Sequence, residues 1–242
     1  MVTSSKAIAA LKELADPIKA KHALRFFKTG KGQYGEGDQF IGAAMPELRK
    51  LAKEFIGLEP RQIEKLLHSK THEQRMLALL ILMFQFNLAK KQTDQKQQKI
   101  IYDYYLSQVD YINNWDLVDV TCRDIVGGFL LDKSKLQKER LIKLSKSDNL
   151  WERRIAIVCT WQFIRQFQFD YTLRISKILL QDEHDLIHKA VGWMLREVGK
   201  KDLQTLIIFL QQHYKKMPRT MLRYAIEKLD ENTRQDFLKG RI

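Results

Sequence analysis

Residues 113–119 read Asn-Asn-Trp-Asp-Leu-Val-Asp, and the apolar pattern that begins there continues toward residue 131. At about 100° per residue, the large apolar side chains of this segment gather on one side of a helix: Trp115, Val118, Cys122, Ile125, Val126 and Phe129. Asp119 lies at the margin of that side, one turn from Trp115. A carboxylate beside a Trp at the edge of a core is costly unless a cation meets it. The stretch predicts an amphipathic helix whose Asp119 needs a cationic partner.

Four further segments share this organisation, in which polar or capping residues lead into an apolar helix with a basic residue near its start. The segments begin at Thr71, Asp148, Asp185 and Pro218. Their basic residues include Arg75, Arg153, Arg154, Lys189 and Arg223. More polar amphipathic helices are predicted between them, over residues 94–106, 133–144, 171–180 and 203–214. The spacing of about 33–43 residues is that of one helix pair in a HEAT-like array.

The N-terminal part extends the same helical pattern. Residues 4–27 predict a helix or helix pair with a break at Asp16-Pro17, and further helices are expected over 45–55 and up to residue 67. The only glycine-rich loop spans residues 30–37, and its glycines lack the order of a phosphate-binding motif. The loop and the preceding helices either clamp a ligand or cap the end of the array.

Composition agrees with a helical protein, because Gly and Pro are scarce while 45% of the residues are hydrophobic. We predict an all-α fold, a superhelical solenoid of antiparallel HEAT-like helix pairs with a basic concave face, forming one domain over residues 1–242. No secretory signal and no membrane span is recognised, and the two cysteines show no disulfide spacing. A cytoplasmic monomer without membrane association is expected.

The net charge of +13 predicts a polyanionic partner, and nucleic acid is the commonest one. Helix N-termini that carry Lys or Arg attract phosphates, so the repeated basic residues are candidate DNA contacts. The simpler alternative is a basic but passive surface.

Motifs for metals, nucleotides and redox chemistry are not recognised, and no metal or cofactor is predicted. What remains is a set of Trp, Asp and Arg residues at the same phase of three successive repeats: Trp115 and Asp119; Trp151, Arg153 and Arg154; Trp193 and Arg196. Taken singly, each Trp is compatible with core packing, and Asp119 with an ion pair to Arg154. Their coincidence on neighbouring helices favours a functional site.

These segments resemble the signatures of the AlkD-type DNA alkylation repair family. The similar stretches are 113–119, Leu-Trp-Glu-Arg-Arg-Ile-Ala-Ile at 150–157 and Lys-Ala-Val-Gly-Trp-Met-Leu-Arg-Glu at 189–197. Residues 34–38 and 46–52 also resemble the N-terminal part of many members. Where some members have a Lys two turns after the matched arginine, this chain has Gln162. That difference affects the inferred phosphate contacts and leaves the catalytic assignment unchanged.

The resemblance implies a monofunctional DNA glycosylase that excises cationic N3- and N7-alkylated purines from duplex DNA without flipping the base into a pocket. It implies that Asp119 is the catalytic carboxylate and that Trp115 and Trp193 flank the lesion. Arg154 and Arg196 would contact phosphates, and we expect Arg75, Arg153, Lys189 and Arg223 to contribute to DNA binding.

Two alternatives remain at this point. One is a non-catalytic HEAT-like protein that binds bent, branched or damaged DNA. The other is a protein-interaction scaffold, since HEAT-like arrays often bind peptides. A base-release assay separates the enzyme from the first alternative, and duplex binding at moderate salt separates it from the second.

Overall fold

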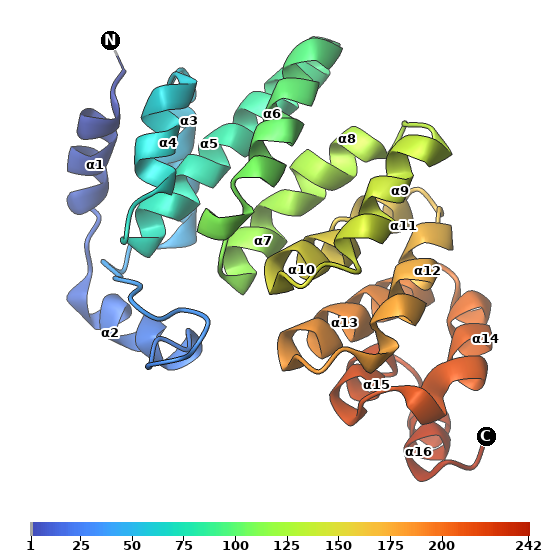
Figure 1. Ribbon diagram of the computed structural model, residues 1–242. Helices are drawn as coiled ribbons and strands as arrows, with labels where there is room; N and C mark the ends of the chain where they lie inside the picture. The colour runs from blue at the N-terminus through green and yellow to red at the C-terminus, as the bar shows by residue number, and fades with distance from the viewer. Residues whose placement is uncertain (1) are drawn as a thin grey trace. The chain divides into compact units, whose positions relative to one another are not determined.

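The computed structural model describes residues 2–242 and divides into two compact units, Met1–Thr121 and Cys122–Ile242 (Figure 1). The described residues form helices and loops, and the one β contact among them is an isolated bridge between Gln39 and Thr71. The all-α prediction is therefore confirmed. The solenoid with a basic concave face and the single domain over 1–242 stay predictions.

The first unit is built around the long helix α5. Its helices are α1 (Ser4–Lys12), α2 (Pro17–Phe26), α3 (Met45–Glu54), α4 (Pro60–Leu67), α5 (His72–Lys91), α6 (Gln95–Ser107) and α7 (Trp115–Cys122), and the boundary between the units falls inside α7. Helix α5 packs against α3, α4 and α6. Every residue from Met76 to Met83 is buried, as expected for a helix that is covered on all sides.

Helix starts in this unit follow the local chemistry of the sequence. The Asp16 carboxylate caps α2 by accepting the backbone N–H groups of Ile18 and Lys19, and Pro17 occupies the first turn. Asp94 caps α6 in the same way through the N–H of Gln97. The break that the sequence predicts at Asp16-Pro17 is confirmed.

The second unit is built around α13. After one π-helical turn (Arg123–Gly127) that continues α7, its helices are α8 (Gly128–Leu130), α9 (Lys135–Leu144), α10 (Leu150–Val158), α11 (Trp161–Arg165), α12 (Asp170–Ile178), α13 (Asp185–Lys201), α14 (Leu203–His213), α15 (Arg219–Ala225) and α16 (Glu231–Lys239). Helix α13 packs against α10, α12, α14 and α15. Gly192 allows α13 and α15 to approach closely, because a Cβ atom there would lie 2.4 Å from the carbonyl oxygen of Met221 in α15.

The predicted repeat helices coincide with observed ones. The segments that begin at 71, 148, 185 and 218 are the starts of α5, α10, α13 and α15, and the polar partners are α6, α9, α12 and α14. The helix predicted from residue 113 toward 131 is also present, as α7, the π-helical turn and α8. No described helix is long and apolar enough to cross a membrane.

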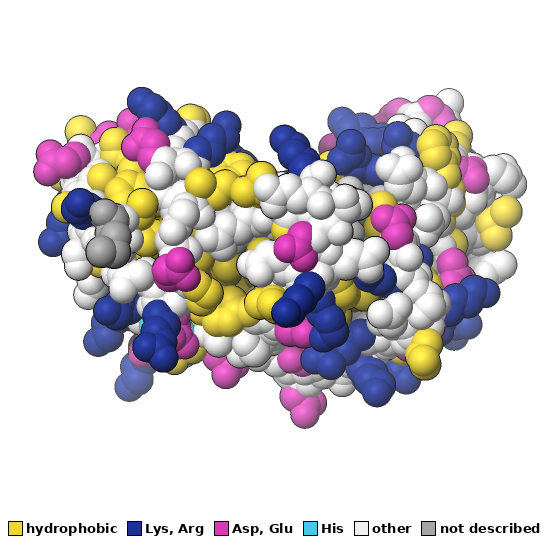
Figure 2. Space-filling model, turned by 90° about the horizontal axis from the view of Figure 1, so that it is seen from above, with side chains coloured by type: hydrophobic (Ala, Val, Ile, Leu, Met, Phe, Trp, Pro, Cys, Tyr) yellow, Lys and Arg dark blue, Asp and Glu magenta, His cyan; other side chains and the backbone are white. Residues whose placement is uncertain are grey.

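Positive charge is distributed over the visible face of the molecule (Figure 2). Figure 2 shows Lys and Arg side chains over much of the visible face, with Asp and Glu side chains between them. This agrees with the net charge of +13. The contacts of each Lys and Arg side chain determine whether that cation is available to a ligand.

Candidate functional site

The N-terminus of α7 is capped by its own sequence motif. The Asn114 side chain, which is fully buried, accepts a 2.8 Å hydrogen bond from the backbone N–H of Trp115. The Asp116 carboxylate accepts another, also 2.8 Å, from the N–H of Leu117. These two bonds satisfy donors that a helix start otherwise leaves unpaired. They fix the position from which Trp115 projects.

His72, at the start of α5, links α7 to the glycine-rich loop. Its Nε2 lies 2.8 Å from Asp116 and its Nδ1 lies 3.4 Å from Asp38, while the residue is only 4% exposed. Burial by itself lowers the pKa of His72, but the hydrogen bonds to Asp116 and Asp38 outweigh it and raise the pKa to about 9. His72 is therefore a cation at neutral pH and donates to both carboxylates.

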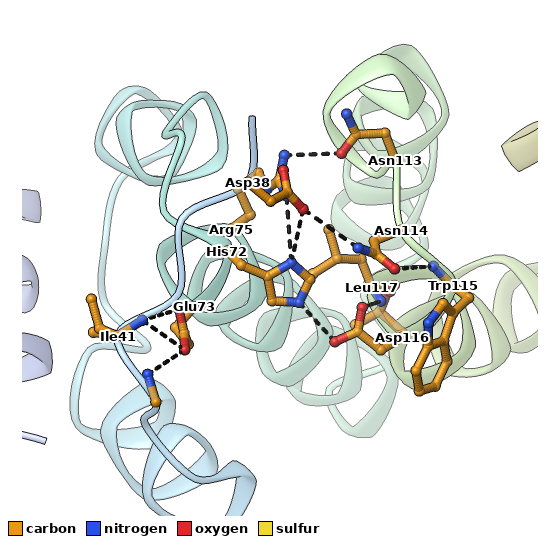
Figure 3. Close-up of polar contacts among 12 residues, drawn as sticks. Asp38, Ile41, His72, Glu73, Arg75, Asn113, Asn114, Trp115, Asp116 and Leu117 are labelled. Atoms are coloured by element: carbon orange, nitrogen blue, oxygen red, sulfur yellow. Dashed lines mark hydrogen bonds and ion pairs between the residues drawn. The ribbon is translucent and has the colours of Figure 1, made fainter. Parts of the chain in front are cut away.

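Asp38 is the centre of a buried polar network (Figure 3). Besides His72 it accepts hydrogen bonds from Arg75 at 2.7 Å and from the Asn114 amide at 3.4 Å. Arg75 in turn donates to the side chain of Asn113 at 2.9 Å. Burial raises the pKa of Asp38, yet the hydrogen bond from His72 and the charge of Arg75 bring that pKa below its ordinary value. The network joins the loop, α5 and the start of α7.

Glu73 holds the segment that follows Asp38. Its carboxylate accepts the backbone N–H groups of Ile41, at 3.1 Å, and Gly42, at 2.7 Å (Figure 3). Gly42 has φ of +86°, and a Cβ atom there would lie 2.1 Å from the carbonyl oxygen of Asp16. The residue must therefore be Gly for this segment to pass so close to the start of α2.

An aromatic pocket lies beside Trp115. The rings of Phe27 and Trp115 are stacked with centroids 5.4 Å apart, and Phe27 also stacks on Phe40 at 4.9 Å. The pocket, of about 540 Å³, is lined by these rings together with His72 and Asp116, among others. Trp115 is half-buried and forms part of its wall. Asp119 follows one turn later on α7, is also half-buried, and is not among the residues lining this pocket.

The arginines of the α10 start are bonded to groups of the second unit. Arg154 is 4% exposed and donates a short hydrogen bond to the carbonyl oxygen of Leu186. Arg153 donates to the carboxylate of Asp182 at 2.7 Å and to the carbonyl oxygens of Ser147 and Asp148. Trp151, on the same helix, is buried. These contacts connect the start of α10 to the start of α13.

On α13, Trp193 and Arg196 are one turn apart and half-buried. Arg196 forms a short ion pair with Glu227, whose side chain is 46% exposed, and lies 3.7 Å from Glu197. Lys189 pairs with Asp185 at 2.7 Å on the helix surface. Arg223, on α15, is exposed to solvent.

Comparison with known proteins decides the family. The family description "DNA alkylation repair enzyme" matches residues 7–229, which is most of the chain. The chain belongs to the DNA alkylation repair enzyme family. No curated protein matches it. Among solved structures it is similar to a "Predicted DNA alkylation repair enzyme from Enterococcus faecalis", with a TM-score of 0.67, 17% identity and coverage of 90% of this chain and 97% of that one. At this identity the likeness concerns the fold.

Within this family member, the structure places the expected site residues in both units. Trp115 and Asp119 share α7 in the first unit, and Trp193 and Arg196 share α13 in the second. That these pairs form one site is a proposal. Arg75 is buried and donates hydrogen bonds to Asp38 and Asn113, and its predicted DNA contact stays a prediction, as does that of the equally buried Arg154.

Several residues around Trp115 were not expected from the sequence: Asp38, Phe27, Phe40, His72, Asn113, Asn114 and Asp116. The signal for three of them was present, because Asn113, Asn114 and Asp116 lie inside the motif that marks α7 and are residue types that cap helices. No motif in the sequence assigns a role to His72. No local pattern reveals that it lies between two carboxylates.

Proposed function

We propose that this chain is a monofunctional DNA glycosylase that releases positively charged N3- and N7-alkylated purines from duplex DNA. The observation that carries the proposal is that Trp115 and Asp119 lie one turn apart on α7. The start of this helix is fixed by the hydrogen bonds of Asn114 to the Trp115 N–H and of His72 to Asp116. Family membership supports a DNA repair substrate. A catalytic group that is held in place before the substrate binds needs no reorganisation at the moment of reaction.

The proposed chemistry is hydrolysis of the N-glycosidic bond. An alkylated purine is cationic, so it leaves with the bonding electron pair as a neutral base. Positive charge then develops on the deoxyribose, and the Asp119 carboxylate stabilises that charge. Water adds to the anomeric carbon and gives up a proton, for which the carboxylate is the nearby acceptor in this scheme. No lysine takes part, so the reaction ends at the abasic site.

Trp115 and Trp193 are proposed to flank the damaged nucleotide. The face of a Trp ring attracts a cation by roughly 0.5–2 kcal/mol, depending on desolvation, and the ring also excludes water from the carboxylate. The resemblance to the AlkD-type family implies that the lesion is handled without flipping the base, and we include this in the proposal. Among the cations of the second unit, Arg153, Arg154, Lys189, Arg196 and Arg223 are the proposed phosphate contacts.

The decisive experiment measures base release from DNA that contains 7-methylguanine. We expect Asp119→Asn to reduce the single-turnover rate by about 10-fold or more, the scale of losing an electrostatic catalytic group. Asp132→Asn, which neutralises an exposed carboxylate, is the matched control and should keep the wild-type rate. A duplex with a neutral lesion should not be processed, because its base is a poorer leaving group. Full activity in Asp119→Asn contradicts the assignment.

A second candidate is a protein that binds damaged DNA without cutting the glycosidic bond. It is favoured if the wild type binds the duplex and releases no base. If the wild type does not bind duplex DNA at all, a protein-interaction scaffold is favoured instead.

A further inference from the structure

Helix α2 stands out in the first unit because it buries none of its residues. Three large apolar side chains are exposed on it: Ile18 is 71% exposed, Leu24 49% and Phe26 72%. Single exposed apolar residues are ordinary, but three within nine residues of one helix form a patch that a partner can cover.

The same segment is strongly basic. Residues 17–28 contain Lys19, Lys21, Arg25 and Lys28 and no Asp or Glu. Lys21 and Arg25 are four residues apart, so they lie on one face of the helix. Lys19 pairs with Asp16 at 3.1 Å, whereas no ion pair within the described part of the chain involves Lys21, Arg25 or Lys28. These three cations differ from Arg75, Arg153 and Arg196, which are all bonded to protein carboxylates.

Both ends of α2 are anchored, so this exposed surface is held in a defined place. At its start, the backbone N–H of Asp16 donates to the carbonyl oxygen of Ile41 at 2.8 Å. At its end, Phe27 stacks on Trp115, and the carbonyl oxygen of Lys28 accepts the N–H of Gly35 at 2.8 Å. The end of α2 therefore lies beside Trp115, and Phe26 and Trp115 both line the aromatic pocket.

We propose that α2 is a DNA-binding surface, in which Lys21, Arg25 and Lys28 contact phosphates and Phe26 packs against sugar and base edges in a groove. The proposal rests on the proposed function for the identity of the polyanion. Cations that flank an exposed apolar side chain are the combination with which groove-binding proteins hold a duplex. A basic amphipathic helix also suits an anionic membrane. The stacking of Phe27 on Trp115 favours DNA, because it places α2 next to the residue proposed to flank the lesion.

The test measures binding of an undamaged duplex as a function of salt, so that catalysis does not enter. For the variant Lys21→Gln/Arg25→Gln/Lys28→Gln, we expect the slope of log K against log salt to become less negative by up to about 2.7, at about 0.9 for each phosphate contact. The control variant Lys90→Gln/Lys91→Gln/Lys96→Gln removes the same charge from exposed positions at the end of α5 and the start of α6. It should keep most of the wild-type slope.

Phe26→Ala tests the apolar part. We expect it to weaken binding several-fold with an unchanged salt slope, since an apolar contact releases no counterions. Its thermal unfolding should match the wild type, because the side chain is 72% exposed.

The outcomes separate this inference from the proposed function. If the triple variant and its control bind alike while the wild type still releases 7-methylguanine, the role of α2 is overturned and the glycosylase assignment stands. If binding depends on α2 but no base is released, the glycosylase assignment fails and the surface stands. If the protein binds vesicles of anionic phospholipid through α2 and does not bind the duplex, the inference is overturned.

Discussion

Trp115 in the first unit and Trp193 in the second have very different surroundings. Near Trp115, Asp38 accepts a hydrogen bond from Asn114, which caps the start of α7. The Asp38 side chain is 6% exposed and is bonded to the cations of His72 and Arg75. Next to Trp193, Arg196 pairs with Glu227, whose side chain is 46% exposed. One Trp therefore lies near a buried network, and the other near an ion pair in which the carboxylate is open to solvent while the Arg196 side chain is 17% exposed.

This difference has a physical consequence for how each residue is held. A buried carboxylate that keeps two cations paired is costly to remove, because the cations are then left unpaired away from water. An ion pair open to solvent is screened and contributes about 0–1 kcal/mol. We infer that the first unit fixes the position of α7, whereas Arg196 keeps the freedom to exchange its partner for a phosphate.

The largest predicted effect comes from removing the central charge of the network. Asp38→Asn should destabilise the first unit by about 3–5 kcal/mol, because Arg75 and His72 lose a shared anion. Glu227→Gln makes the same chemical change at the exposed pair and should cost less than about 1 kcal/mol. Hydrogen exchange of the α5 and α13 amides, measured at increasing urea concentration, reports on the stability of the two units separately. Equal losses in the two variants contradict the comparison.

The next effect is a pH dependence confined to the first unit. The pKa of His72 is raised from 6.5 to about 9 in the folded state. The charged His72 therefore adds about 3 kcal/mol to the free energy of unfolding. This contribution is fully present below pH 6.5 and is lost as the pH rises through about 9. The charged groups in contact with His72 are Asp38, Asp116 and Arg75. A pH series of unfolding should show the decline in the wild type.

His72→Gln is the control for that series, since it has no titrating group at this position. Its stability should be lower than that of the wild type at neutral pH, and the difference should shrink toward alkaline pH. A difference that stays constant between pH 6.5 and pH 9 contradicts the assignment of a charged His72.

The comparison also shows what the sequence can predict. The apolar run over residues 76–83 and the capping residues before Trp115 are local signals, and they predict α5 and the start of α7 correctly. The contacts of the network join residues far apart in the chain: Arg75 to Asp38 across 37 positions and His72 to Asp116 across 44. Polar pairs of this kind leave no periodic pattern in the sequence.

Arg75 illustrates why the rest of the site was harder to predict. It occupies the same place in its repeat as Arg154, so the sequence alone assigns both to DNA. In the folded unit the guanidinium of Arg75 binds Asp38, at the end of the glycine-rich loop, whereas Arg154 donates to the carbonyl oxygen of Leu186. The sequence leaves open whether the loop clamps a ligand or caps the array, and in the folded unit Asp38 at its end binds the buried cation of Arg75.

The smallest predicted effect tests whether Arg196 exchanges partners. If Arg196 binds a phosphate, Glu227 competes for it, and Glu227→Gln should tighten duplex binding a few-fold, equivalent to less than about 1 kcal/mol. Glu231→Gln removes an equally negative, exposed charge of the same unit that pairs with Arg234, and it measures the general effect of net charge. The gain in Glu227→Gln should exceed this control and disappear when Arg196→Gln is added. If the gain persists in the double variant, the Glu227 charge acts on DNA without Arg196. The proposed exchange of Glu227 for a phosphate at Arg196 is then wrong.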